Sequence, residues 1–210
     1  MATTKVDVNL ISATGTPGSG NFLRGDGTWN SPTAGMTLVG TAVASGSSSL
    51  TITGLDSTYD TYCIALSDLV PATDGVYGWF RVGDSSGVDS GSTDYGWSMS
   101  SFQIDNTSHG SHTNEDNSDA QMVVTNPSNA VGNAAGEGMG ALIYIHRPGD
   151  GTTNVGMTGM GVSYRNDGES CYQHFGGDRR EVIVVDRVQF LFSSGNVATG
   201  RMTVWGLAHA

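Results

Sequence analysis

From Met36 onward, apolar and polar residues alternate along most of the chain, and turn-forming residues interrupt the alternation roughly every eight to twelve positions. A period of two places successive side chains on opposite faces of a strand, whereas a helix needs a period near 3.6. No segment shows convincing helical periodicity. The pattern predicts an all-β fold, an antiparallel β-sandwich that is jelly-roll-like. The predicted strands are 36–44, 49–53, 61–69, 76–82, 95–103, 120–125, 140–147, 155–162, 170–175, 181–192 and 201–207.

Two apolar segments predict strands at the centre of a sheet. Residues 141–145 and 182–185 carry apolar side chains at consecutive positions, which indicates burial on both faces. Alternation is clearer in 76–82, where Phe80 is expected on the face opposite Trp79. The segment 76–82 is therefore predicted to be a strand with one buried face.

The first 35 residues differ from the rest and are expected to form an extended N-terminal arm. Residues 6–10 alternate as a short strand could, and residues 13–20 are rich in Gly, Ser and Thr, which is typical of a linker. The predicted organisation is therefore an arm for attachment and oligomerisation, 1–35, followed by a β-sandwich domain, 36–210.

The arm contains a cassette between Ser19 and Trp29 that includes the letters FLRGDGTW. Gly25 and Gly27 flank Asp26, and this spacing predicts a tight turn in which glycine adopts positive φ angles and Asp26 hydrogen-bonds to its own backbone. The turn is expected to bring the large apolar side chains of the cassette together on one side. The candidate anchor residues are Phe22, Leu23, Arg24, Asp26 and Trp29.

The apolar side chains of the cassette cannot keep it folded on their own. Burying three of them contributes about 2 kcal/mol each, whereas ordering about a dozen residues costs ~1 to 2 kcal/mol per residue. The cassette therefore needs a second surface to pack against. A neighbouring copy of the chain or a host particle would supply one, and the C-terminal domain of the same chain is the alternative.

A long polar segment, 104–119, interrupts the strand pattern. It is too polar to be buried, and it is predicted to be a loop. A loop of this length in a compact domain is usually functional or disordered. Its candidate receptor-contact residues are Asn106, His109, His112, Asn114 and Asp116.

Charge narrows the range of partners. The formal net charge is -11, and charged residues make up 14% of the chain, against a usual value near 25%. DNA and RNA would be repelled, so no nucleic-acid partner is expected. The sequence shows neither a long apolar run nor a secretory signal pattern, so we expect cytoplasmic synthesis without membrane insertion. Cys63 and Cys171 have no metal-like spacing and are expected to be buried thiols.

Candidate catalytic residues do not form a convincing set. His146 and His174 lie in or beside predicted strands, but neither Ser170 nor Ser193 has the sequence context of a nucleophile elbow. The carboxylates in 167–169 sit on a predicted turn that fixes no useful separation for glycoside cleavage. We therefore expect a protein that is not an enzyme.

Metal binding by the polar segment is also weakly supported. His109 and His112 could place two imidazoles on one metal, but a zinc site needs a defined third ligand on a rigid frame. Residues 114–119 loosely suggest a calcium loop and lack the fixed glycine and terminal glutamate of an EF-hand. No metal and no other cofactor is expected.

The FLRGDGTW cassette is similar to an element that recurs in tail-fibre and other virion structural proteins of tailed bacteriophages. Segments 59–62, 66–75, 187–196 and 200–207 resemble phage tail-associated or capsid-associated sandwich domains, which end on a strand of the form G-x-hydrophobic-x-hydrophobic-x-G-hydrophobic. The resemblance implies a virion structural protein, assembled in the host cytoplasm as a homotrimer and bound to other virion proteins.

The resemblance leaves two placements open. A tail fibre or receptor-binding protein would attach through its arm and contact host surface glycans through 104–119. A capsid cement protein would insert its arm between major capsid subunits, and the short stretch before the cassette favours this placement, since long fibres carry a shaft there. A third hypothesis is a secreted carbohydrate-binding module. We expect the fibre.

Overall fold

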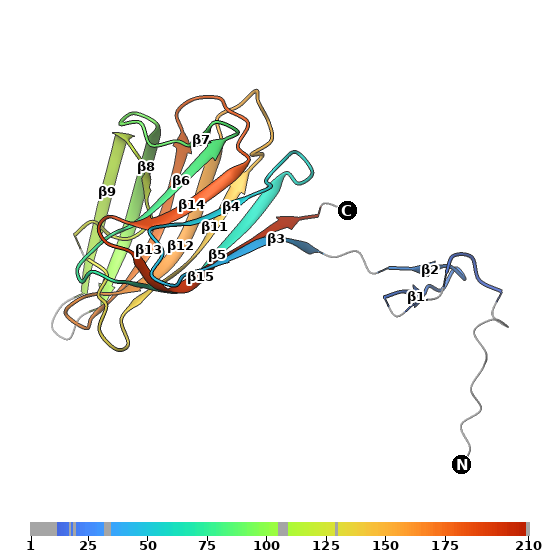
Figure 1. Ribbon diagram of the computed structural model, residues 1–210, viewed down its shortest axis with the longest axis horizontal. Helices are drawn as coiled ribbons and strands as arrows, with labels where there is room; N and C mark the ends of the chain where they lie inside the picture. Colours follow the sequence, from blue (N-terminus) through green and yellow to red (C-terminus); the bar gives the residue numbers. More distant parts are fainter. Residues whose placement is uncertain are drawn as a thin grey trace, which may run out of the picture. The chain divides into compact units, whose positions relative to one another are not determined.

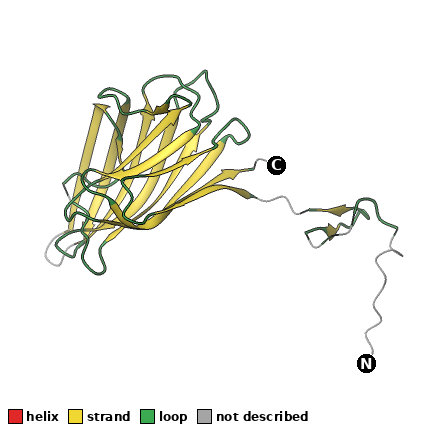
Figure 2. Cartoon of the chain, in the orientation of Figure 1, coloured by secondary structure: helices red, strands yellow, loops and turns green. Residues whose placement is uncertain are grey.

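The computed structural model describes residues 12–16, 18, 20–31, 35–104, 109–128 and 130–208. The chain divides into two compact units, Met1–Gly35 and Met36–Ala210 (Figure 1). Within the described residues of both units, the secondary structure consists of strands, turns and loops without a helix (Figure 2). Those residues accordingly contain no helix that could span a membrane.

The larger of two sheets in the second unit, called here the large sheet, has eight strands among the described residues. Every neighbouring pair in it is antiparallel. The strands, in their order across the sheet, are β3 (Met36–Val43), β15 (Val197–Leu207), β5 (Thr61–Pro71), β11 (Gly138–His146), β12 (Gly156–Tyr164), β13 (Ser170–Arg179), β8 (Tyr95–Ile104) and β9 (His109–Asp119).

The second sheet, called here the small sheet, packs against one face of the large sheet (Figure 1). It is also antiparallel. Its strands, in order, are β10 (Met122–Val123), β6 (Gly78–Asp84), β14 (Arg187–Phe192) and β4 (Leu50–Thr53), with β7 (Gly87–Val88) paired to β6. The two sheets make an antiparallel β-sandwich, which confirms the predicted fold class.

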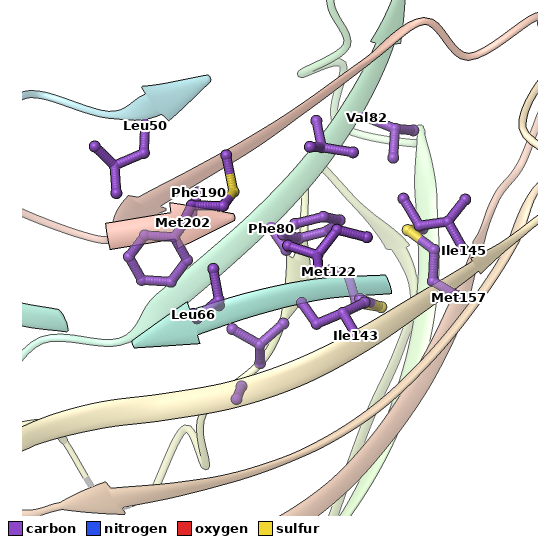
Figure 3. Packing of buried hydrophobic residues seen from close by; sticks show 14 of the residues in the cluster. Leu50, Leu66, Phe80, Val82, Met122, Ile143, Ile145, Met157, Phe190 and Met202 are labelled. Atoms are coloured by element: carbon purple, nitrogen blue, oxygen red, sulfur yellow. The ribbon is translucent and has the colours of Figure 1, made fainter. Parts of the chain in front are cut away.

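The hydrophobic core fills the space between the sheets (Figure 3). Phe80 and Phe190 from the small sheet and Ile143 from the large sheet are fully buried there. Trp79 is only partly buried, which confirms the predicted alternation in β6. Both cysteines are buried thiols as predicted, and burial raises the pKa of Cys63. The labelled core side chains in the figure are Leu50, Leu66, Phe80, Val82, Met122, Ile143, Ile145, Met157, Phe190 and Met202.

Each predicted strand overlaps an observed one, but the interpretation of 181–192 was wrong in its first half. The strand begins at Arg187, and Val184 is 52% exposed rather than buried in a sheet centre. Val185 N–H donates to the Pro148 carbonyl in a turn, and Asp186 N–H donates to the Gly83 carbonyl of β6. Regular pairing with β6 and β4 begins only at Arg187.

The prediction for 141–145 was right in position and wrong on one face. The strand β11 lies between β5 and β12 inside the large sheet. Ile143 and Ile145 are fully buried, but Leu142 remains 40% exposed on the opposite face. The sandwich has only two layers, so the small sheet covers one face of β11 and leaves the other uncovered.

Residues 109–119 form a strand, which corrects the predicted loop over 104–119. The strand β9 pairs along its length with β8, from Ile104 opposite His109 to Tyr95 opposite Asp119. It lies at the edge of the large sheet. An edge strand obtains its backbone hydrogen bonds from one neighbour, so its side chains can all be polar. Such side chains also discourage further pairing at this edge.

Candidate functional site

The arm cassette forms a small hairpin in the first unit. The strands β1 (Phe22–Leu23) and β2 (Trp29–Asn30) pair antiparallel, with Leu23 opposite Trp29. Arg24 N–H donates to the Thr28 carbonyl at 2.8 Å, which closes the turn. The turn residues of the sequence therefore do form a hairpin.

Asp26 stabilises this turn through its carboxylate. Its Oδ1 accepts hydrogen bonds from the Thr28 hydroxyl at 2.7 Å and from the Thr28 N–H at 3.0 Å. These two bonds lower the pKa of Asp26, so the side chain is a carboxylate at neutral pH. Arg24 lies 3.8 Å from the same carboxylate, and both side chains are about half exposed. An exposed pair of this kind adds little stability.

Two details of the predicted turn were wrong. Gly27 has a φ of +79°, but Gly25 does not adopt a positive φ. Consecutive strand residues point to opposite faces, so Leu23 and Trp29 share one face while Phe22 lies on the other, opposite Asn30. The large apolar side chains therefore do not converge on a single side.

The residues before the hairpin pack against it. Thr14 bridges to Thr28, and Trp29 N–H donates to the Thr14 carbonyl at 2.8 Å. Asn21 Nδ2 donates to the Thr16 carbonyl at 2.7 Å. The stretch interpreted as a linker thus covers part of the hairpin, and Trp29 is only partly exposed. Phe22 and Leu23 remain 48% and 39% exposed.

The predicted receptor-contact residues fall on or before β9. Asn106 lies outside the described residues, and only the backbone of His109 is described, as the first residue of the strand. His112 and Asn114 are opposite the buried Ser101 and Met99, so they face the inside of the sandwich. Asn114 Nδ2 donates to Asn126 Oδ1 at 3.3 Å. Asp116 is likewise opposite the buried Trp97, so His112, Asn114 and Asp116 share one face of β9.

Asp116 lines a hollow beside β9 on the large sheet. The hollow has a volume of about 940 Å³. It adjoins a groove of about 540 Å³, with which it shares Ser98, Glu115, Thr158 and Gly176. Both lie mainly over the face of the large sheet turned away from the small sheet, which we call the outer face. Strand positions occupied by Gly and Ser leave room there for a ligand with hydroxyl and amide groups.

Tyr144 and His174 form the walls of the smaller groove. Tyr172 Oη and His174 Nε2 share a hydrogen bond of 2.7 Å, and their rings meet edge to face at 4.9 Å. The pKa of Tyr144 is raised by the neighbouring Cys63 and by burial. Its neutral phenol is a group on which a sugar ring could stack.

Groups considered for catalysis are engaged elsewhere. His146 Nε2 lies 3.4 Å from Thr158 Oγ1, and Asp167 and Glu169 both form ion pairs with Arg165. In the part of the chain that the structure describes, no three His, Cys, Asp or Glu side chains gather as a metal site.

The outer face carries a second feature, a set of exposed apolar side chains. The sequence signal for it is a change of phase within single strands: apolar residues of β8 occupy odd positions up to Met99 and even positions from Phe102. The same change occurs in β12 between Met157 and Met160. The alternation of apolar and polar residues is enough to locate these strands. It does not show which face each half of a strand exposes unless one also follows whether the apolar residues stand at odd or even positions.

Comparison of the chain with family models, curated proteins and solved structures finds no match. The assignment of a function therefore depends on the surfaces described above.

Proposed function

We propose that this chain is a non-enzymatic structural protein of a bacteriophage virion, a homotrimeric tail fibre or receptor-binding protein. The arm attaches it to other virion proteins, and the β-sandwich is presented to the host. The observation that carries the proposal is the hairpin, because it exposes Phe22 and Leu23 on a unit separate from the sandwich. Exposed apolar side chains of this size on a small unit are typical of an anchoring element.

The receptor-binding surface in this proposal is the hollow beside β9. Glu115, Asp116 and Asn117 supply hydrogen-bonding groups on its rim, and Arg180 and Asp178 supply more at its end. Side chains with planar polar groups can bind several sugar hydroxyls at once. The class of ligand that fits is a neutral or weakly charged surface glycan.

A capsid cement protein is the second candidate. It is favoured by the hairpin arm, which is folded locally and could fit between shell subunits. In that case the chain would occur in many copies over the shell, whereas a fibre would occur in few copies at the tail. Cryo-electron microscopy of particles that contain the chain separates the two by position. A secreted carbohydrate-binding module would be found on neither.

The anchoring role can be tested by replacing Phe22 and Leu23 with Ser in the full-length chain and measuring how much of it sediments with particles. We expect at least a tenfold loss, because the hairpin's exposed apolar contacts would be removed. The matched control replaces Val182 and Val184 with Ser, since these are also exposed and lie on the sandwich. Unchanged sedimentation of the Phe22 and Leu23 variant would contradict the anchoring role.

A further inference from the structure

One half of the outer face is apolar. In β12 the outward-pointing Met160, Val162 and Tyr164 are 44%, 37% and 44% exposed, and Phe102 of β8 is 51% exposed. A sheet with one solvated face normally turns polar side chains outward. The exposed apolar side chains of this half, which we call the outer patch, are Phe102, Ile104, Leu142, Met160, Val162, Tyr164 and Tyr172.

Strand pairing makes the outer patch continuous. Val162 is directly opposite Tyr172, and Tyr172 is directly opposite Phe102, so these three side chains form a ridge across β12, β13 and β8. Next to the ridge lies a hollow of about 400 Å³ over β5, β11 and β12. Ala65 and Gly140 keep this hollow open, because neither has a large side chain.

The outer patch is poor in charge, although the chain as a whole carries a net charge of -11. Its seven members include no Asp, Glu, Lys, Arg or His. Titratable side chains around it on the outer face include His174 and, on the neighbouring strands, Glu115 and Arg201. Loss of charged residues at the centre, together with enrichment in Tyr, Phe and Met, is the composition of protein interfaces. A repeated acidic surface would oppose contact between copies, and the outer patch avoids that repulsion.

The outer patch is also large enough. Eight strands about 4.8 Å apart, with about nine residues each at ~3.3 Å, give the whole outer face roughly 1,100 Å². The apolar half is about 550 Å², so two copies in contact bury roughly 1,100 Å² in total, above the ~1,000 Å² that a specific interface needs.

We propose that the outer patch is the interface between copies of this chain, with the ridge of one copy seated in the hollow of the next. The ridge and the hollow are different surfaces, so the ridge of one copy can enter the hollow of the next, and a head-to-tail contact of this kind can close into a ring. This inference rests on the oligomer in the proposed function and names its contact surface. We expect three copies.

The proposal predicts the effect of one charge in the patch. Val162→Glu places a carboxylate on the ridge, and we expect the dissociation constant between copies to rise at least tenfold, because the charge would be desolvated in the contact. Light scattering coupled to size exclusion measures the mass of the full-length chain. Val182→Glu is the control, since Val182 is 43% exposed outside the patch. A wild-type monomer at micromolar concentration, or a Val162→Glu variant with the wild-type mass, would overturn the interface.

A second measurement does not depend on a disruptive variant. Cys63 and Cys171 are buried, so a cysteine introduced by Val162→Cys or Val182→Cys would be the accessible thiol. We expect maleimide to label Val162→Cys at least tenfold more slowly than Val182→Cys in the oligomer, and equally fast in denaturant. Equal labelling of the native proteins would contradict the proposal. Slow labelling in a chain that is monomeric would also contradict it, because another part of the same chain would then cover the patch.

Failure of this inference can be told apart from failure of the proposed function. If the chain sediments with particles but Val162→Glu leaves its mass unchanged, the interface is wrong and the virion role stands. If copies associate through the patch but no particle carries the chain, the interface stands and the virion role is wrong.

Discussion

Two halves of the same three strands differ in which face is apolar. In one half, Met99, Met157 and Phe175 point into the sandwich and are nearly fully buried. In the other half most inward positions are polar and the outward positions are apolar. The inward residues there include Ser101, Ser163 and Gln173, with the buried Cys171 beside them, and the outward ones include Phe102, Val162 and Tyr172.

The difference comes from the sequence and not from a shift in strand pairing. The register of β12 with β13 and of β13 with β8 continues without a bulge through both halves. Sliding one strand by a residue would exchange its faces, so continuous pairing means that the apolar pattern itself changes phase. We call the halves the ordinary half and the inverted half. The contrast shows that the backbone pairing of strands can be complete in both halves while the exposed apolar side chains of the inverted half still lack a surface that covers them.

The largest expected effect compares two methionines on β12. Met157 is 1% exposed in the ordinary half, and Met160 is 44% exposed in the inverted half. Met157→Ala should lower the free energy of unfolding by about 2–5 kcal/mol, because it leaves a cavity in the core. Met160→Ala should change it by less than about 0.5 kcal/mol when copies are kept separate by dilution. Urea unfolding of both variants measures the contrast, and equal losses would remove the distinction between the halves.

The inverted half is expected to depend on hydrogen bonds where the ordinary half depends on packing. Asn126 is fully buried; its Nδ2 donates to Ser101 Oγ at 2.6 Å, and its Oδ1 accepts from Ser128 N–H at 2.7 Å. Asn126→Ala should cost about 1–3 kcal/mol in urea unfolding, because buried groups lose their partners. The control is Asn133→Ala, since Asn133 is exposed and its Nδ2 donates to the Ala72 carbonyl. A loss no larger than in the control would show that the buried amide does not hold this half.

The sequence predicted where the strands lie more fully than which way they face. Alternation located β8 and β12, because both halves of each strand keep a period of two even though the apolar residues switch from odd to even positions in the middle of the strand. The edge strand β9 was missed, since its pairing requires no apolar side chain and its eleven residues from His109 to Asp119 include no Val, Ile, Leu, Phe, Tyr or Trp. Of the candidate contact residues, Asp116 lines the hollow beside β9 and Asn114 lines the adjoining groove, where its Nδ2 also donates to Asn126.

Acid should affect the ordinary half more than the inverted half. Asp56 Oδ1 accepts hydrogen bonds from Thr58 N–H and from Tyr62 Oη, both at 2.8 Å, at the end of β5 where the ordinary half lies. These bonds, the one from Thr58 N–H first, lower the pKa of Asp56 below its usual 3.8. Its contribution to stability is therefore complete above the usual pKa and is lost as the pH falls through the lowered one.

The size of this effect is limited by exposure, since Asp56 lies at the surface. Less than about 1 kcal/mol is expected because solvent screens such groups. Asp56→Asn should make the free energy of unfolding fall less steeply as the pH drops below about 4. Asn126→Ala should leave that slope unchanged, because amides and hydroxyls of the inverted half do not titrate. An unchanged slope in Asp56→Asn would contradict the assignment.

The smallest effect sharpens the comparison most, because it asks whether the inverted half needs its inward polarity. Gln173 is fully buried; its Nε2 lies 3.5 Å from Ser163 Oγ, and its Oε1 has no hydrogen-bond partner among the described residues. An unpartnered buried oxygen is unfavourable, and methionine has a similar shape without it. Gln173→Met should therefore leave the free energy of unfolding unchanged or raise it by up to about 1 kcal/mol. A loss above about 1 kcal/mol would mean that the inward amide stabilises this half, so that its polarity serves the folded chain itself. If Gln173→Met leaves the free energy of unfolding unchanged, the inward polar residues are not needed for stability. The feature of this half that matters would then be the apolar residues that the change of phase turns outward.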